Sequence, residues 1–279
     1  MLRKMRPERT PFIATHLADV PQVASNTTLS VDAARAKHLA FAVAAAKSGA
    51  TTYHPRCSAS RRTLFLEFGV RDGRSISHLA RLSNSTTWHG FDSFRGLPEE
   101  IASTRTSTEG NESKLLKLTW RRGIYTRSGR RPSVPHNVAL HGGWFNQTLP
   151  TFLDSARVAD AAVAFAHLDA DLYSSTAQVL WSLGSRCRLC AGTVLAFDEL
   201  FGSAAVEAKE WRALRHAARC FGYRFQFISY MAHPRSAFGR AAVQLTEVPP
   251  PPPPGQACGK QQLHTTAHAH GPCHLLASA

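Results

Sequence analysis

The sequence has no long apolar run, and this absence excludes one class of protein. No stretch approaches the roughly 18 uninterrupted apolar residues that a membrane-spanning helix needs. The basic start, MLRKMRPER, lacks the apolar core of a secretory signal peptide, while Glu8 and Asp19 are early acids for an organelle transit peptide. We therefore expect a cytoplasmic protein without a membrane partner; organelle import is the less supported alternative.

Several chemical motifs are also missing. No G-x-G-x-x-G follows an apolar run, which disfavours a nicotinamide dehydrogenase. Acidic residues are few, 19 against 33 Lys and Arg, and the formal net charge is +14. Residues 114–131 carry a basic surplus with no acid among them. A solvated basic loop is the favoured interpretation over nucleic-acid binding, because no zinc-finger spacing and no basic-aromatic RNA motif accompanies it.

The six cysteines are scattered along a chain that is large enough to fold without cross-links. This pattern favours a reducing compartment, with Cys187 and Cys190 as buried structural thiols. Asn26, Asn84, Asn111 and Asn146 each begin an N-x-Ser/Thr triplet. Because this triplet is common by chance and no signal peptide supports it, we do not expect glycosylation.

Size and composition predict one large domain with tails. The chain has 279 residues, 43% of them hydrophobic. We expect a flexible leader at 1–30, a domain at 31–247 with a polar, basic insertion or lid at 99–135, and a disordered tail at 248–279. The tail begins with the proline run 249–254 and continues with scattered histidines that match no compact metal site.

Acidic pairs follow two apolar runs. Residues 161–168 form a run typical of a strand buried on both faces, and Asp169 and Asp171 follow it. In an extended backbone these two carboxylates would face one site. A second run, 192–197, ends at Asp198 and Glu199. Four acids at neighbouring strand ends predict a pocket for Mg²⁺, Mn²⁺ or Ca²⁺, with one carboxylate free to act as a base. Helix capping by Asp198 beside a solvated Glu199 is the alternative.

A glycine turn predicts a second function for the same edge. Gly69 and Gly73 bracket the turn between an apolar strand at 63–68 and a helix opened by Ser75. A further strand, 86–91, ends at Asp92, which lies 19 residues beyond Gly73. An acid in this place accepts the ribose hydroxyls of adenosine-containing cofactors. Helix capping is the alternative for Asp92 alone.

The other predicted elements complete an α/β chain. Helices are expected at 31–48, near 152–156, at 204–221, and at 112–120 within the insertion; the helix after Asp171 would be capped by one of residues 174–176. A third parallel strand is expected at 137–141 and a loop at 142–150. The strands 223–230 and 237–246 are expected to pair antiparallel.

Five ordered blocks carry a family resemblance. They are LEFGVRDGRS (66–75), GFDSFRGLP (90–98), GGWFNQTLP (142–150), HLDADLYSST (167–176) and FDELFG (197–202). Together they resemble the macrocin O-methyltransferase family. The resemblance covers about residues 63–246 and implies a Rossmann-like class I methyltransferase, with a mostly parallel seven-stranded sheet and helices on both faces.

The resemblance also implies an activity and its residues. It implies methyl transfer from S-adenosylmethionine to a hydroxyl of a sugar-like or other polyhydroxy molecule, with Asp171 as general base. Mg²⁺ would be held by Asp169, Asp198 and Glu199, the last standing where the family often has a second aspartate. The implied cofactor-binding residues are Glu67, Phe68, Gly69, Val70, Gly73, Ser75, Asp92, Ser93, Trp144 and Asp169.

Two other functions stay open at this point. Asp169 and Asp171 form an Asp-x-Asp that could serve a metal-dependent glycosyltransferase, although such an enzyme does not require the glycine turn and Asp92. A non-catalytic relative could use the basic segment 114–131 to bind nucleic acid. The sequence is also compatible with a homo-oligomer.

Overall fold

The computed structural model describes residues 11–24, 28–48, 63–109, 112–236, 238–250 and 273; within 101–120 it describes the backbone only. The helices and strands are α1 (Pro11–His16), α2 (Val31–Ser48), β1 (Thr63–Phe68), α4 (Arg74–Arg81), β2 (Trp88–Asp92), β3 (Ile101–Glu109), β4 (Glu112–Trp120), β5 (Val138–Gly142), α5 (Phe145–Leu153), β6 (Ala162–Leu168), α6 (Tyr173–Ser185), β7 (Val194–Phe201), α7 (Ala204–Glu207), α8 (Glu210–Phe221), β8 (Arg224–Met231) and β9 (Gly239–Glu247).

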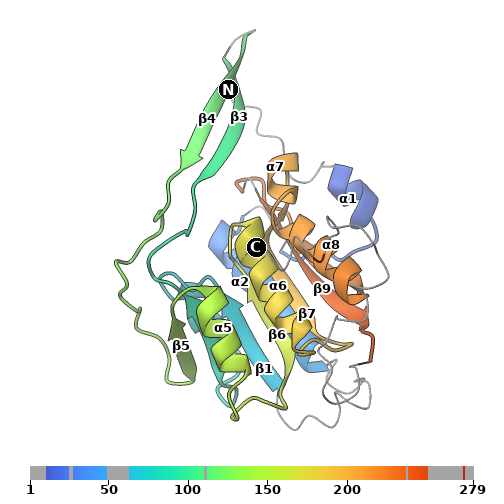
Figure 1. The fold of residues 1–279 in the computed structure, drawn as a ribbon. Helices are drawn as coiled ribbons and strands as arrows, with labels where there is room; N and C mark the ends of the chain where they lie inside the picture. The colour runs from blue at the N-terminus through green and yellow to red at the C-terminus, as the bar shows by residue number, and fades with distance from the viewer. Residues whose placement is uncertain are drawn as a thin grey trace.

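A seven-stranded sheet forms the centre of the fold, in the order β5-β2-β1-β6-β7-β9-β8 (Figure 1). The pairs from β5 to β7 are parallel, and β9 runs antiparallel to both β7 and β8. Every residue of β6 is buried, as its apolar run predicts. The strand order reverses between β1 and β6, and ligands of open α/β sheets bind in the crevice outside such a reversal.

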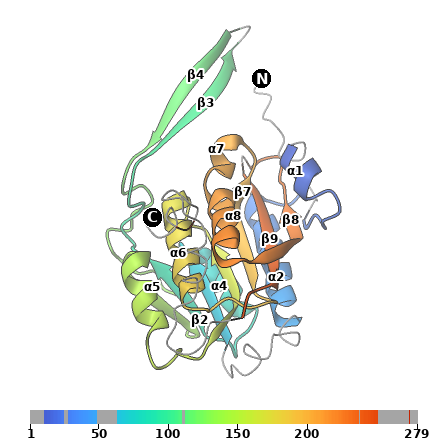
Figure 2. The same ribbon diagram turned by 45° about the vertical axis from the view of Figure 1, so that its right-hand side comes forward.

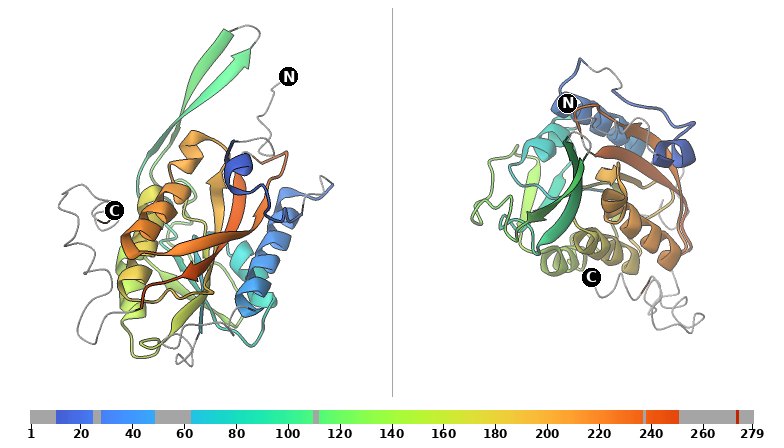
Figure 3. Two further views of the ribbon diagram at one scale, coloured as in Figure 1. Left: turned by 90° about the vertical axis from the view of Figure 1, so that its right-hand side faces the viewer. Right: turned by 90° about the horizontal axis from the view of Figure 1, so that it is seen from above.

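Two apolar clusters hold helices against this sheet. One cluster joins strand side chains to α5, α6 and α8, and includes Leu66, Leu149 and Leu183. The other joins strand side chains to α2 and α4, and includes Phe165 and Leu79. Figure 3 shows α2 and α4 on one side of the sheet and α5, α6 and α8 on the other.

The prediction of a helix at 112–120 is wrong, because this segment is strand β4. It pairs antiparallel with β3, and the register runs from Ile101 opposite Trp120 to Glu109 opposite Glu112. The preceding Thr-rich segment offers a partner strand, and β-branched residues favour such pairing over a helix. In Figures 1 and 2 the β3–β4 hairpin projects away from the sheet.

Backbone hydrogen bonds join the two segments that flank this hairpin. The N–H of Leu97 donates to the carbonyl of Ile124 at 3.1 Å, and the N–H of Gly123 donates to the carbonyl of Leu97 at 3.0 Å. Phe94 accepts two more, from Arg127 at 3.0 Å and Gly129 at 2.8 Å. The hairpin therefore rises from a base that is closed by its own hydrogen bonds.

Three helix boundaries also differ from the sequence-based expectation. The expected loop 142–150 contains most of α5, which begins at Phe145 after Trp144. The helix expected at 204–221 is broken into α7 and α8 at Lys209, whose backbone is not helical. Helix α6 follows Leu172 with no side-chain cap, so its first turn does not use the predicted serine or threonine.

The cysteines correct another expectation. Cys220 in α8 forms a disulfide with Cys273, and Cys187 and Cys190 are also disulfide-bonded. None of these four described cysteines is a free thiol. The prediction of buried structural thiols is therefore wrong, because spacing along a chain does not reveal which distant cysteine approaches in space.

The described part of the predicted leader packs on the domain. Phe12 of α1 is buried and stacks on Phe201 with ring centroids 5.1 Å apart. Among the described residues, no helix combines the length and apolar character that a membrane crossing requires. The predicted tail lies outside the described residues, apart from residues 248–250 and Cys273.

Candidate functional site

The site lies where four neighbouring strands end at the same level. Phe68 of β1 is level with both Phe91 of β2 and Leu168 of β6, and Leu168 is level with Phe197 of β7. The residues that follow these four are therefore placed along one edge of the sheet: Gly69, Asp92, Asp169 and Asp198. Sequence reasoning finds this edge because β1, β6 and β7 are clear apolar runs and all four strands are followed or ended by glycine or aspartate.

A cavity of about 450 Å³ lies at this edge. Of the predicted residues, those that line it are Gly69, Asp92, Ser93, Trp144, Asp169, Asp171, Asp198 and Glu199. The other predicted cofactor residues do not line it. Glu67, Phe68 and Val70 are buried beneath the wall, and Gly73 and Ser75 lie at the start of α4.

The turn after β1 lies against the end of β6. Gly69 has φ of +94°, and its N–H donates to the carbonyl of Phe91 at 3.0 Å. A Cβ on Gly69 would stand 1.8 Å from the carbonyl oxygen of Asp169. Only glycine fits here, because both the backbone angle and the contact exclude a side chain.

Asp92 ties together two loops at the cavity. Its carboxylate accepts hydrogen bonds from the backbone N–H of Arg71 at 2.7 Å and of Phe94 at 2.6 Å. Its carbonyl accepts one from Gly143 at 2.9 Å. Each carboxylate oxygen has a second lone pair, so a fixed Asp92 can still accept hydrogen bonds from a ligand in the cavity.

Asp169 and Asp198 share one cation. The Arg35 guanidinium, from α2, donates through Nη2 to Asp169 Oδ2, and its Nε lies 2.5 Å from Asp198 Oδ1. All three side chains are at most about one quarter exposed. Nothing in the sequence singles out Arg35, which stands in an Ala-rich helix far from the acidic motifs.

A second arginine binds Asp198 from the other side. Arg240 of β9 donates from Nε to Oδ1 at 2.9 Å and from Nη2 to Oδ2 at 3.1 Å. Burial alone would raise the pKa of Asp198, but the charges of Arg240 and Arg35 hold it well below its usual range. Asp198 is therefore a permanently ionised, fully engaged carboxylate.

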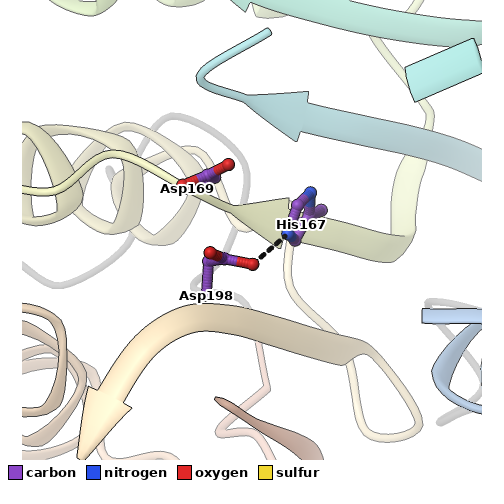
Figure 4. Close-up of side chains that lie close together, drawn as sticks. All are labelled: His167, Asp169 and Asp198. Carbon is purple, nitrogen blue, oxygen red and sulfur yellow. Dashed lines mark ion pairs between the residues drawn. The ribbon is translucent and has the colours of Figure 1, made fainter. Parts of the chain in front are cut away.

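His167 lies in β6, and Figure 4 shows its ring beside Asp198. Its Nδ1 is 2.7 Å from Glu67 Oε1, on the neighbouring strand, and its Nε2 is 3.8 Å from Asp198 Oδ1. Burial opposes a charge on the imidazole, but Asp198 and Glu67 outweigh it and raise the pKa of His167 to about 9. Glu67 therefore supports the site from inside the protein.

Asp171 is held in an unusual backbone conformation. Its φ is +60°, and the N–H of Leu172 donates across it to the carbonyl of Ala170 at 2.6 Å, which closes a tight three-residue turn. Such turns are rare and strained for a residue with a side chain, and they concentrate at functional sites. The turn directs Asp171 into the same cavity as Asp169, although the backbone is not extended as predicted.

The acids facing Asp171 make its proton hard to remove. Burial, followed by the charges of Glu199 and Asp169, raises the pKa of Asp171 well above its usual range. Burial also raises the pKa of Glu199, to about 7, although Lys209 Nζ lies 3.5 Å from Glu199 Oε2. Asp171 therefore takes up a proton more readily than an ordinary aspartate.

Glu210, which sequence reasoning missed, braces both acidic loops. This fully buried side chain accepts hydrogen bonds from the backbone N–H of Ala170 at 3.4 Å and of Glu199 at 3.0 Å. It thereby fixes the backbone beside Asp171 to the backbone of Glu199. Two further unpredicted residues, Arg122 and Tyr125, bring the basic segment to the cavity wall.

The residues as arranged do not fit the expected divalent metal. Among the described residues, ligand atoms of His167, Asp169 and Asp198 lie within 4.8 Å of one another. However, His167 is protonated near neutral pH, and both oxygens of Asp198 are bound by Arg240. Arg35 spans the space between Asp169 and Asp198. A dication between these two carboxylates would therefore have to displace the guanidinium of Arg35.

Comparison with known proteins identifies the domain. Residues 66–200 match the family model described as a methyltransferase domain. This part of the chain is a methyltransferase domain. It begins within β1 and ends within β7, so the methyltransferase domain contains the strand ends that bear Gly69, Asp92, Asp169 and Asp198. No curated protein matches the chain.

Solved structures share limited similarity with the chain. CalS11, a TDP-rhamnose 3'-O-methyltransferase of calicheamicin biosynthesis, is 21% identical over 74% of this chain and 78% of its own, with a TM-score of 0.42. The O-methyltransferase NovP is 19% identical over 72% and 79%, with a TM-score of 0.42. The Podospora anserina methyltransferase PaMTH1 is 13% identical over 74% and 88%, with a TM-score of 0.38.

Gly69→Ala is expected to lower the free energy of unfolding by about 2 kcal/mol or more, because the added Cβ must push the β1 turn away from Asp169. Chemical denaturation measures this loss. Gly129→Ala is the matched control, since Gly129 also has positive φ, +77°, but has nothing within 4 Å of the added Cβ. It should cost only roughly 1 kcal/mol of backbone strain. Equal losses in both variants would show that the contact with Asp169 is unimportant.

The His167 imidazolium is expected to make stability pH-dependent. Its pKa is raised from 6.5 to about 9 on folding, so its contribution is complete below pH 6.5 and is lost as the pH rises through 9. That contribution is on the order of 3 kcal/mol. Denaturation between pH 6 and 10 should show this loss in the native chain and not in His167→Gln. Substitution of the exposed His136 by Gln should leave the slope unchanged; a native slope in His167→Gln would refute the assignment.

Proposed function

We propose that this protein is an S-adenosylmethionine-dependent O-methyltransferase that acts on a hydroxyl of a sugar-like or other polyhydroxy small molecule. The observation that carries the proposal is one cavity lined by Gly69 and Asp92 on one side and Asp171 on the other, within a methyltransferase domain. The sequence blocks that resemble macrocin O-methyltransferases contribute most of these residues.

The proposed cofactor site lies along β1 and β2. The turn at Gly69 exposes backbone where a ligand can approach closely, and Asp92 keeps lone pairs for the ribose hydroxyls. Ser93 and Trp144 line the same cavity and would contact the rest of the cofactor. Glu67, Phe68 and Val70 would not contact the cofactor; they lie buried beneath the cavity wall and would fix the shape of the end of β1.

The proposed reaction needs alignment and the removal of one proton. The sulfonium methyl group of the cofactor is already reactive, so orientation supplies much of the barrier reduction. The acceptor oxygen attacks the methyl carbon, the carbon–sulfur bond breaks with its electron pair staying on sulfur, and S-adenosylhomocysteine leaves. The acceptor O–H proton passes to the carboxylate of Asp171, whose raised pKa suits a general base.

The cavity wall suits a polar acceptor. Besides the acids, the residues that line it include Asn146, Gln178, Tyr125 and Arg122, all of which have polar side chains. These groups donate and accept hydrogen bonds as a polyhydroxy molecule requires. The glycosyltransferase alternative is disfavoured, because the Arg35 contact engages Asp169 and leaves no free Asp-x-Asp pair for a metal–nucleotide sugar.

Asp171→Asn is expected to bind S-adenosylmethionine with native affinity and to lose at least about 100-fold in turnover, the usual contribution of a general base. Calorimetry measures the affinity, and release of S-adenosylhomocysteine over a panel of hexosides, inositols and nucleotide sugars measures turnover. In the native protein kcat/KM should rise with pH as Asp171 loses its proton, whereas the variant should lack this rise.

Asp92→Asn tests the cofactor site, and the exposed Asp19→Asn is its control. Asp92→Asn should weaken cofactor binding by roughly tenfold, the effect of one charged hydrogen bond, while Asp19→Asn should change nothing. Absence of S-adenosylmethionine binding by the native chain would overturn the proposed function. Full turnover of Asp171→Asn would exclude Asp171 as the base while leaving the cofactor site intact.

A further inference from the structure

We propose that the guanidinium of Arg35 occupies the position between Asp169 and Asp198 where a divalent metal was expected, so that methyl transfer by this protein is independent of metal. The inference deepens the proposed function and rests on it. Arg35 would serve as a positioning residue, because it acts by holding the two carboxylates at the cavity.

The geometry is that of a bridge between two strands. Asp169 follows β6 and Asp198 lies in β7, and Figure 4 shows the two side chains on these neighbouring strands. Arg35 meets the first through Nη2 and the second through Nε, so two nitrogens of one planar group contact both acids. A planar fork of donors is suited to such bidentate bridging.

The charges of Asp169 and Asp198 are compensated without another cation. Two arginines, Arg35 and Arg240, face the two carboxylates of Asp169 and Asp198. The sequence-based set of metal ligands also included Glu199, which pairs with Lys209. Adding a dication would leave surplus positive charge in a half-buried cluster, and an uncompensated buried charge is costly.

The backbone that carries Arg35 is fixed. Helix α2 packs against β6, β7 and β8, and the residues beside and one turn after Arg35, Ala34 and His38, are buried. Ser30 Oγ accepts a hydrogen bond from the N–H of Ala33 at 3.1 Å and so closes the first turn. A fixed helix holds the guanidinium at the carboxylates in the absence of any ligand.

This arrangement changes how the acceptor hydroxyl is activated. A metal would act as a Lewis acid on the acceptor oxygen, whereas a guanidinium offers only hydrogen bonds and charge. Arg35 lines the cavity, so its guanidinium lies beside the space where the acceptor would bind. Removal of the acceptor proton would then fall to Asp171.

Mn²⁺ binding followed by electron paramagnetic resonance tests the inference directly. The native protein, purified with EDTA, should bind no Mn²⁺ at millimolar concentration. Arg35→Ala should gain at least about tenfold in Mn²⁺ affinity, because it uncovers two adjacent carboxylates. Lys37→Ala removes an exposed positive charge from the same helix and should gain nothing. Arg35→Lys, which keeps the charge but loses the fork, should fall between them.

Turnover in EDTA gives the second readout. Native turnover should be unchanged by EDTA and by added Mg²⁺. Stoichiometric Mn²⁺ binding by the native protein, or loss of its turnover in EDTA, would overturn the inference. Mn²⁺ binding does not depend on methyl transfer, so a failure of the proposed function, seen as absent S-adenosylmethionine binding, is distinguished from a failure of this inference.

A separate observation concerns the oxidised cysteines. Cys187, Cys190 and Cys220 all lie in disulfides, and disulfides form and persist in oxidising compartments rather than in a reducing cytosol. From these bonds we infer that the chain folds in an oxidising compartment and carries an N-linked glycan at Asn84.

Asn84 has the placement that a glycan needs. It is exposed in the turn between α4 and β2, and its triplet ends at Thr86, whose Oγ1 lies 2.7 Å from Ser83 Oγ. The turn precedes β2, whereas the cavity lies beyond the other end of that strand. Asn146, by contrast, lines the cavity, where a glycan would obstruct it. The triplets at Asn26 and Asn111 lie outside the described residues.

Expression of the full chain in the secretory lumen of a eukaryotic host, and in a reducing bacterial cytosol, tests this inference. Lumenal protein should show no free thiol when denatured without reductant, and PNGase F should lower its mass. The Thr86→Ala variant should lose that shift, whereas Thr86→Ser should keep it. Unmodified Asn84 in the lumenal protein, or a fully reduced cytosolic protein with an identical melting temperature, would overturn it.

Discussion

The site depends on a contact that leaves no room for a side chain. Gly69 lies so close to the carbonyl of Asp169 that β1 and β6 end as one unit. The proposed cofactor turn and the proposed base therefore cannot move independently. Because Phe68, Phe91, Leu168 and Phe197 stand at one level, the parallel register extends this single contact to four strands.

Burying so many acids at one edge is costly unless each has a partner. The protein divides them into groups with different surroundings. Asp198 is neutralised by two arginines and Glu67 by the His167 imidazolium, whereas the buried Glu210 accepts hydrogen bonds from the backbone of both acidic loops. Asp171 lines the cavity and faces Glu199 and Asp169, and so its affinity for a proton is raised. The surroundings of each carboxylate, rather than its residue type, therefore decide which acid accepts a proton.

Local pattern predicts much of this protein. The apolar runs mark β1, β6 and β7, and the residues that end them, Gly69, Asp169 and Asp198, do meet at one cavity. Sequence reasoning misses the residues that reach the site from segments distant in the chain. Arg35 and Arg240 come from segments with no motif, yet they decide what Asp198 can bind. The β3–β4 pairing and the disulfides also depend on partners that periodicity does not show.

The closed base of the β3–β4 hairpin makes this element modular. Leu97, Gly123, Phe94 and Gly129 are joined by backbone hydrogen bonds below the hairpin, so the chain enters and leaves it at a fixed separation. The length and composition of the hairpin can therefore change while the cavity wall at Tyr125 stays in place. Replacement of the hairpin in an engineered or evolved form of this chain would therefore change the outer surface of the protein and leave the cavity as it is.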